Sequence, residues 1–81
     1  MTQATQDKLS RVLSQVFGVP ADQIQEASSP DTIATWDSLT HIHMVVALEF
    51  EFGVSLAPDD AMEMLSVKLI RMILKERGAE L

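Results

Sequence analysis

The sequence contains no cysteine, and only three glycines and three prolines among its 81 residues. The absence of cysteine excludes a disulfide framework, a thiolate zinc site and a thiol nucleophile. Sparse glycine and proline, together with 47% apolar residues, are typical of a folded chain rather than a disordered one. A chain of this length makes one small domain, predicted to span residues 1–81.

Long hydrophobic runs are also lacking. No run approaches the roughly 18 apolar residues that indicate a membrane span. The first residues, MTQATQDK, have neither the basic start nor the apolar core of a signal peptide. We therefore expect a cytoplasmic, monomeric protein that does not insert into membranes.

Basic residues are absent from the middle of the chain. Between Val12 and Val67 there are nine acidic residues and no lysine or arginine, and the formal net charge of the whole chain is -6. Such a middle should repel nucleic acid and anionic membrane, and should attract basic protein surfaces. The alternative is a solvated acidic surface that only improves solubility.

The N-terminal segment has the apolar spacing of a helix. A single stripe at i, i+3, i+4, i+7 and i+8 predicts a helix from about Thr5 to Phe17, stopped by Gly18. Residues 18–37 then form a connection that is long for a compact domain. Its isolated apolar residues should pin it across the bundle, with a helical turn near Ala21–Gln25. These pinning residues are Val19, Ile24, Ile33 and Trp36.

Three further helical segments are predicted. One runs from Ser38 to about Phe52 and ends at Gly53, and a short turn follows Pro58. The last helix begins after Ser66, a plausible N-cap, with an apolar face formed by Leu69, Ile70, Ile73 and Leu74. No period-2 run indicates a strand. The fold class is therefore all-α: a small three-to-four-helix bundle with a long loop between helices one and two.

The segment 38–52 carries two apolar stripes, although one is enough to pack a helix into a small bundle. Met44, Val45, Leu48 and Phe52 form the first stripe, and Leu39, Ile42, Val46 and Phe50 form the second. The second stripe either meets the long loop or is left for a partner. Whether Ile33 and Trp36 of the loop cover Leu39 and Ile42 is open at this stage.

Ser38 begins this helix, in the stretch TWDSLTHIHM. A nucleophilic serine needs a base and oxyanion donors, and although His41 lies three residues on, no glycine-flanked elbow is present. His41 and His43 point about 200° apart on a helix, so they cannot share a metal ion. We expect His41 to face the core and His43 to face solvent, with no catalytic residue and no metal. Two compatible interpretations remain, a helix cap by Asp37 or Ser38 and a phosphate ester on Ser38.

The stretch WDSLTHIHMVVALEFEFGVSL, preceded by a long loop and a first amphipathic helix, resembles the acyl and peptidyl carrier proteins over essentially the whole chain. The D-S-L motif of that family falls on Asp37, Ser38 and Leu39. The resemblance implies that Ser38 receives 4′-phosphopantetheine from coenzyme A, through a separate magnesium-dependent phosphopantetheinyl transferase. The protein would then be a carrier and not an enzyme. An acyl- or aminoacyl-loading enzyme and downstream synthase, transferase or tailoring enzymes would be its partners.

The resemblance also implies that the helix starting at Ser38 is the main partner-docking element. The partner-facing positions by this resemblance are Leu39, Ile42, His43, Val46, Glu49 and Phe50. Many fatty-acid carriers have acids at the positions of His43 and Phe50, and the tryptophan of WDSL is similar to D-alanyl and other specialised carriers. We therefore predict a discrete carrier in a polyketide, nonribosomal peptide or related pathway.

Three other functions remain open. Within the carrier class, the chain could be a D-alanyl or other aminoacyl carrier, or a primary fatty-acid carrier. Outside it, the alternative is a helical protein-interaction module in which Ser38 is only an N-cap. Such a module would not react with coenzyme A and a phosphopantetheinyl transferase.

Overall fold

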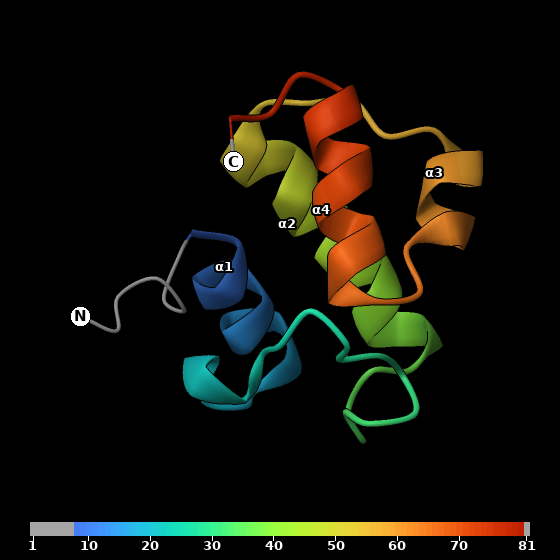
Figure 1. Cartoon of the computed structure of the whole chain (residues 1–81). Helices are drawn as coiled ribbons and strands as arrows, with labels where there is room; N and C mark the ends of the chain where they lie inside the picture. The colour runs from blue at the N-terminus through green and yellow to red at the C-terminus, as the bar shows by residue number, and fades with distance from the viewer. Residues whose placement is uncertain (1–7, 81) are drawn as a thin grey trace.

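The computed structural model describes residues 8–80, and within that range every regular element is a helix. The elements in chain order are α1 (Lys8–Phe17), the short 3-10 helix η2 (Ala21–Gln23), α2 (Ser38–Phe52), α3 (Pro58–Glu63) and α4 (Val67–Glu76), as Figure 1 shows. The predicted all-α bundle, with its long loop between the first two α-helices, is confirmed. The predicted start of the first helix at Thr5 lies outside the described residues. No helix within residues 8–80 has the length and hydropathy needed to cross a membrane.

The helix boundaries follow from residues that stop or start helices. Gly18 and Gly53 follow α1 and α2 with φ of 70° and 64°, the left-handed conformation that glycine adopts without strain. The Ser66 hydroxyl accepts a hydrogen bond from the backbone N–H of Leu69 at 3.1 Å and so caps α4. Pro58 occupies the first turn of α3, where its missing N–H removes no helical bond. These predicted boundaries are confirmed.

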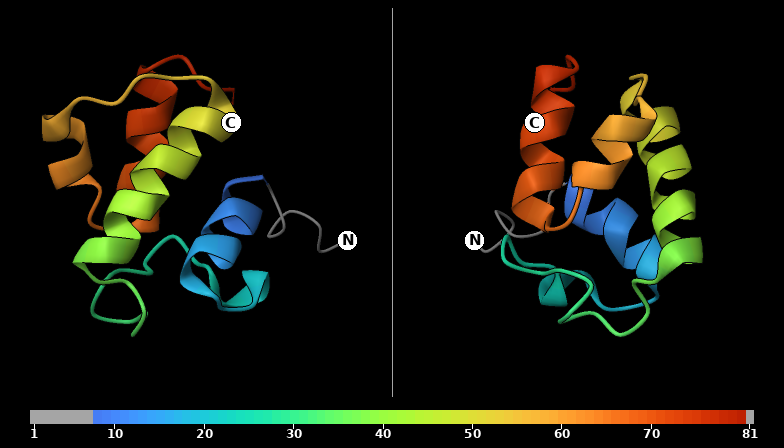
Figure 2. Two further views of the ribbon diagram at one scale, coloured as in Figure 1. Left: turned by 180° about the vertical axis from the view of Figure 1, so that it is seen from behind. Right: turned by 90° about the vertical axis from the view of Figure 1, so that its right-hand side faces the viewer.

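The core lies where α1, α2 and α4 face one another, and the long loop closes it from one end. In the right-hand view of Figure 2, α2 and α4 stand on opposite sides with α3 between them. The helices contribute Leu9, Val12, Leu13, Phe17, Met44, Leu48, Val67, Ile70, Ile73 and Leu74. The segments between helices add Ile24, Ile33, Trp36 and Met64. Ile24, Ile33 and Trp36 are buried and Val19 packs against the core while partly exposed, so the four pinning residues act as predicted. Burying an apolar side chain of this size stabilises a fold by about 1.5–3 kcal/mol.

The prediction for α4 was wrong at one position. Ile70, Ile73 and Leu74 are buried together with Val67, but Leu69 is 40% exposed. At 100° per residue, Leu69 lies more than 90° from the centre of the buried face, so it faces outward at its edge. The predicted face included Leu69 because it is apolar and stands next to Ile70 in the sequence.

The loop before α2 is held to the helices at its middle and again near α2. Its backbone carbonyls at Glu26 and Ser28 accept hydrogen bonds of 3.0 Å from the first N–H groups of α4, which lack partners inside their own helix. Glu26 also forms an ion pair with Arg71 at 2.9 Å. Near α2, the Thr35 hydroxyl donates to the carbonyl of Phe17 at the end of α1, at 2.6 Å. The start of α2 therefore has a fixed position relative to α1 and α4.

Candidate functional site

Ser38 is the first residue of α2, and its side chain is exposed. The residue before it, Asp37, is the N-cap, since its carboxylate accepts a hydrogen bond from the backbone N–H of Thr40 at 3.0 Å. The Thr40 hydroxyl accepts in return from the backbone N–H of Asp37 at 2.8 Å, which completes a capping box. The hydrogen bond from the backbone N–H of Thr40, followed by one from the Thr40 hydroxyl at 3.2 Å, holds the pKa of the Asp37 carboxyl below its ordinary value. The capping residue is therefore Asp37, which the sequence alone could not decide.

The Ser38 hydroxyl is left available for chemistry. It makes no hydrogen bond within the part of the chain that the structure describes. It also stands at the end of α2 where unpaired backbone N–H groups and the helix dipole favour negative charge. A phosphate ester on this oxygen would be accepted without breaking any described contact.

His41 does not act as a base for Ser38, because both of its ring nitrogens are engaged elsewhere. Its Nδ1 accepts a hydrogen bond from the indole N–H of Trp36 at 2.9 Å, and its Nε2 lies 2.7 Å from the carbonyl oxygen of Ala61. This pattern requires the neutral ring with its proton on Nε2, which donates to Ala61. His41 is half-buried and His43 is exposed, as predicted. The arrangement offers no activated serine nucleophile.

A groove of about 610 Å³ opens beside Ser38. Its walls come from the long loop, the first turns of α2, and α3 together with Leu65 in the segment after it. The residues that matter for its shape are Trp36, Ser38, His41, Ile42, Ala61 and Met62. Sequence reasoning missed the α3 wall, because a six-residue helix is too short to show a helical period.

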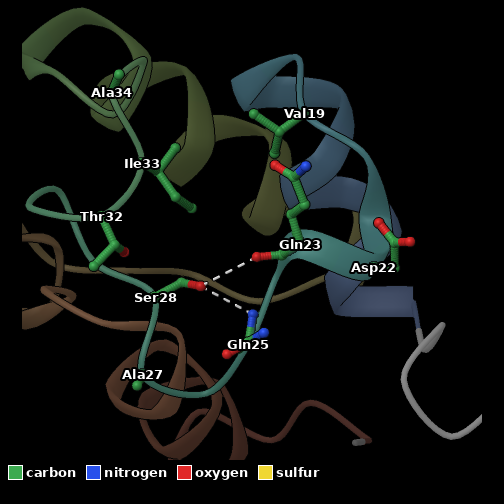
Figure 3. A pocket seen from close by; sticks show the side chains of 9 residues that line it. All are labelled: Val19, Asp22, Gln23, Gln25, Ala27, Ser28, Thr32, Ile33 and Ala34. Carbon is green, nitrogen blue, oxygen red and sulfur yellow. Dashed lines mark hydrogen bonds between the residues drawn. The ribbon is translucent and has the colours of Figure 1, made fainter.

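A second hollow of about 550 Å³ lies within the long loop and shares no lining residue with the groove beside Ser38. Figure 3 shows the Ser28 hydroxyl at its edge, accepting from the backbone N–H of Gln25 at 2.9 Å and donating to the carbonyl of Gln23 at 3.4 Å. Every dashed contact in this view lies within the loop itself. The hollow thus reflects how the loop is folded.

The second apolar stripe of α2 is exposed in the structure. Leu39, Ile42 and Val46 are each about 60% exposed, and Phe50 is 83% exposed. Ile33 and Trp36 are turned into the core and leave this stripe open. Met44 and Leu48, on the other side of α2, are fully buried. The question that the sequence left open is settled in favour of an uncovered surface.

Two other predicted docking positions differ in their surroundings. His43 is exposed on α2. Glu49 is half-buried, and its carboxylate accepts a hydrogen bond from the backbone N–H of Leu56 at 2.8 Å. Glu49 therefore holds the connection between α2 and α3, a role that the sequence did not indicate.

Helix α3 is fastened to the end of α4 by a buried carboxylate. The guanidinium of Arg77 donates to both oxygens of Asp60, at 2.9 and 2.7 Å, and the backbone N–H of Ala57 donates to the same side chain at 3.0 Å. The hydrogen bonds from Arg77, followed by that from Ala57, lower the pKa of Asp60 below its ordinary value. The pair sets one end of the groove's α3 wall.

This pair predicts a pH-dependent contribution to stability. Because the pKa of Asp60 is lowered on folding, its contribution is present above the pKa of the unfolded chain and is lost as the pH falls through the lowered value in the folded protein. Asp60→Asn should therefore lower the melting temperature at pH 7, and the difference from wild type should shrink in acid. Thermal melts by circular dichroism would measure this, with the exposed neighbour Asp59→Asn as control. An equal deficit for Asp60→Asn at every pH would contradict it.

Comparisons with known proteins agree with this geometry. The acyl carrier protein of Nitratidesulfovibrio vulgaris strain DP4 is 33% identical over 66 residues, covering 80% of this chain and 86% of that protein. That of the Miyazaki F strain is 32% identical over the same length and coverage. This chain belongs to the acyl carrier protein family. No protein-family model matches it.

A solved structure gives the same result for the fold. The solution NMR structure of a holo acyl carrier protein from Geobacter metallireducens superposes with a TM-score of 0.79 at 25% identity, over 90% of this chain and 84% of that one. Acyl carrier proteins are non-catalytic and carry covalently attached 4′-phosphopantetheine, so the predictions of a carrier and of its cofactor are confirmed at the level of the family. The exposed, unbonded hydroxyl of Ser38 fits such a group.

Proposed function

We propose that this acyl carrier protein holds its cargo as a thioester on 4′-phosphopantetheine attached to Ser38. The observation that supports this most directly is that two neighbouring residues at the start of α2 have separate roles. Asp37 caps the helix through Thr40, and the neighbouring Ser38 hydroxyl is exposed and without a partner. The cofactor supplies the thiol that this cysteine-free chain lacks.

The attachment reaction balances without any further reagent. The Ser38 oxygen forms a bond to the phosphorus that bears the pantetheine, and the pyrophosphate bond of coenzyme A breaks. Adenosine 3′,5′-bisphosphate leaves, and the serine proton passes to a base of the magnesium-dependent phosphopantetheinyl transferase. Asp37 and Leu39 flank the reacting serine, so the transferase would contact both residues when it binds Ser38.

Partner enzymes would dock on the exposed stripe of α2 next to Ser38. Amphipathic helices commonly bind a partner by laying their apolar face into a hydrophobic groove, with contacts from residues spaced at i, i+3 or i+4 and i+7. Its members would be Leu39, Ile42, His43, Val46 and Phe50, with Glu49 contributing less because it bonds Leu56. The tether would keep the cargo at high effective concentration near each loading or downstream enzyme.

The direct test is the intact mass of the protein after incubation with coenzyme A, magnesium and a broad-specificity phosphopantetheinyl transferase. We expect a gain of one phosphopantetheinyl group. A folded protein that gains no mass would instead support the helical interaction module, which carries no cofactor.

We further infer a dedicated biosynthetic pathway, such as a polyketide or nonribosomal peptide pathway, rather than primary fatty-acid synthesis. Phe50 and His43 are exposed on the docking stripe where many fatty-acid carriers have acids, so docking should depend more on apolar contact than on charge.

Fatty-acid synthase enzymes should therefore load and elongate on this protein poorly. Phe50→Glu should raise their kcat/KM several-fold by adding an acid that steers association, whereas the uncharged Phe50→Gln should not. Loading and elongation on the wild type as fast as on the enzymes' own carrier would contradict a dedicated pathway.

A further inference from the structure

The ring of His41 links three parts of the fold at the groove beside Ser38. It accepts from the indole of Trp36, which belongs to the loop, and donates to Ala61 of α3, while its own backbone belongs to α2. All three residues line the groove. One side chain therefore connects the long loop, α2 and α3, the three parts of the fold that line the groove.

This link is the outermost layer of a stack that reaches into the core. The rings of Phe17 and Trp36 are stacked at 4.7 Å between centroids, and the rings of Trp36 and His41 follow at 6.2 Å and 18°. Phe17 and Trp36 are buried, whereas His41 is half-buried at the groove. The order runs from the core outward and ends at His41.

Buried core residues follow shortly after both ends of the His41–Ala61 bond in the sequence. Met44 is one turn further along α2 from His41, and Met64 is three residues beyond Ala61; both are fully buried. Met62, by contrast, lines the groove and is exposed. A passage from the groove into the core that opened between His41 of α2 and Ala61 of α3 would have to break the bond that joins them.

We propose that His41 is a specificity-determining residue: by bonding Trp36 and Ala61 across the groove, it closes the passage into the core, so that apolar acyl cargo on Ser38 stays in the surface groove. This rests on the proposed attachment at Ser38. An acyl chain gains free energy by leaving water, and the core is the most apolar place within its reach. To enter, it would have to break both bonds of His41 and leave the buried indole N–H of Trp36 without a partner, which is unfavourable.

The methionines offer a direct test. We would load Ser38 enzymatically from coenzyme A or from octanoyl-coenzyme A and record ¹³C-methyl NMR spectra of Met44, Met62 and Met64. In the wild type, the octanoyl chain should shift Met62 relative to the pantetheine form and leave Met44 and Met64 unchanged. In His41→Ala, it should also shift Met44 and Met64. Comparing the two loaded forms of one variant removes shifts that come from the substitution itself.

Two further variants make the result decisive. Ser55→Ala, at an exposed residue that does not line the groove, should behave as the wild type. His41→Phe keeps a ring against Trp36 but has no nitrogen, and should admit the chain as His41→Ala does, which covers the case in which the alanine variant does not fold. Shifts of Met44 and Met64 in the wild type would overturn the proposal, and so would their absence in both His41 variants.

Failure of the proposed attachment at Ser38 can be told apart from failure of the proposal for His41. If Ser38 gains no mass, the attachment itself is refuted. The link can then still be measured in the unmodified chain, where the indole N–H resonance of Trp36 should move upfield in His41→Phe as its hydrogen bond is lost. An unchanged resonance would contradict the link independently of any cargo.

Discussion

Ser38→Ala is expected to abolish the gain of a phosphopantetheinyl group completely, while leaving the stability of the protein almost unchanged. The first effect follows because the serine oxygen is the only atom at this position that can form the phosphate ester. The second follows because the hydroxyl makes no hydrogen bond in the described structure and is exposed. Substitutions at such surface positions usually change stability by less than about 0.5 kcal/mol.

The neighbouring substitution should show the opposite pattern. Asp37→Ala removes the carboxylate that receives the Thr40 N–H and so leaves the start of α2 uncapped. The melting temperature should fall by about 4–8 °C, the usual effect of losing one helix cap in a domain of this size. The Ser38 hydroxyl is still present, so mass should still be gained, though more slowly if the transferase contacts Asp37.

Intact mass and thermal melts of the two variants would measure both effects, with Ser55→Ala as an exposed serine control. A large loss of stability in Ser38→Ala would show that the serine has a structural role that the geometry does not indicate. A mass gain in Ser38→Ala would move the attachment point to another residue.

Trp36→Ala is expected to cost about 3–5 kcal/mol of unfolding free energy, the range for removing a large buried aromatic side chain. Trp36 is 4% exposed, stacks on Phe17 and donates to His41. Small domains have only about 5–15 kcal/mol in total, so this variant should lose a large share of its stability. The part affected first should be the loop that delivers the chain to Ser38.

Trp36→Phe is the matched variant, because it keeps an aromatic ring against Phe17 but loses the indole N–H. We expect it to cost about 1–2 kcal/mol, mainly from the lost hydrogen bond to His41. Urea unfolding followed by circular dichroism would compare the three proteins, since fluorescence disappears with the only tryptophan. Equal costs for the two variants would mean that the hydrogen bond, rather than the packed ring, carries the effect.

Local signals in the sequence were sufficient for most of the fold. Gly18, Gly53 and Ser66 stop or start helices through backbone chemistry that does not depend on the rest of the molecule, so the boundaries they predicted were confirmed. The two stripes of α2 followed from its periodicity alone. The prediction failed at Leu69 because the apolar character of a residue does not show where the buried face of a helix ends.

The arrangement around Ser38 depended on contacts between distant segments, which a single sequence does not reveal. Asp37 and Ser38 are both good capping residues, and only the structure shows that the carboxylate of Asp37 accepts the backbone N–H of Thr40. The bond from His41 to Ala61 spans 20 residues, and that from Arg77 to Asp60 spans 17. No periodicity or local motif predicts such pairs, so the walls of the groove could be found only in the structure.

The length of the exposed stripe of α2 has a consequence for how a partner holds this helix. From Leu39 to Phe50 there are eleven residue steps, which at 1.5 Å each place Phe50 about 16 Å along the helix from the residue beside Ser38. A partner that contacts both ends cannot rotate about a single point of contact, so it fixes the direction of the helix axis as well as its position. Because the fastened loop gives the start of α2 a fixed place in the fold, the far end of the stripe would then control the direction in which the arm leaves Ser38. Two enzymes that contact different lengths of this helix could thus receive the same cargo at different angles to the helix axis.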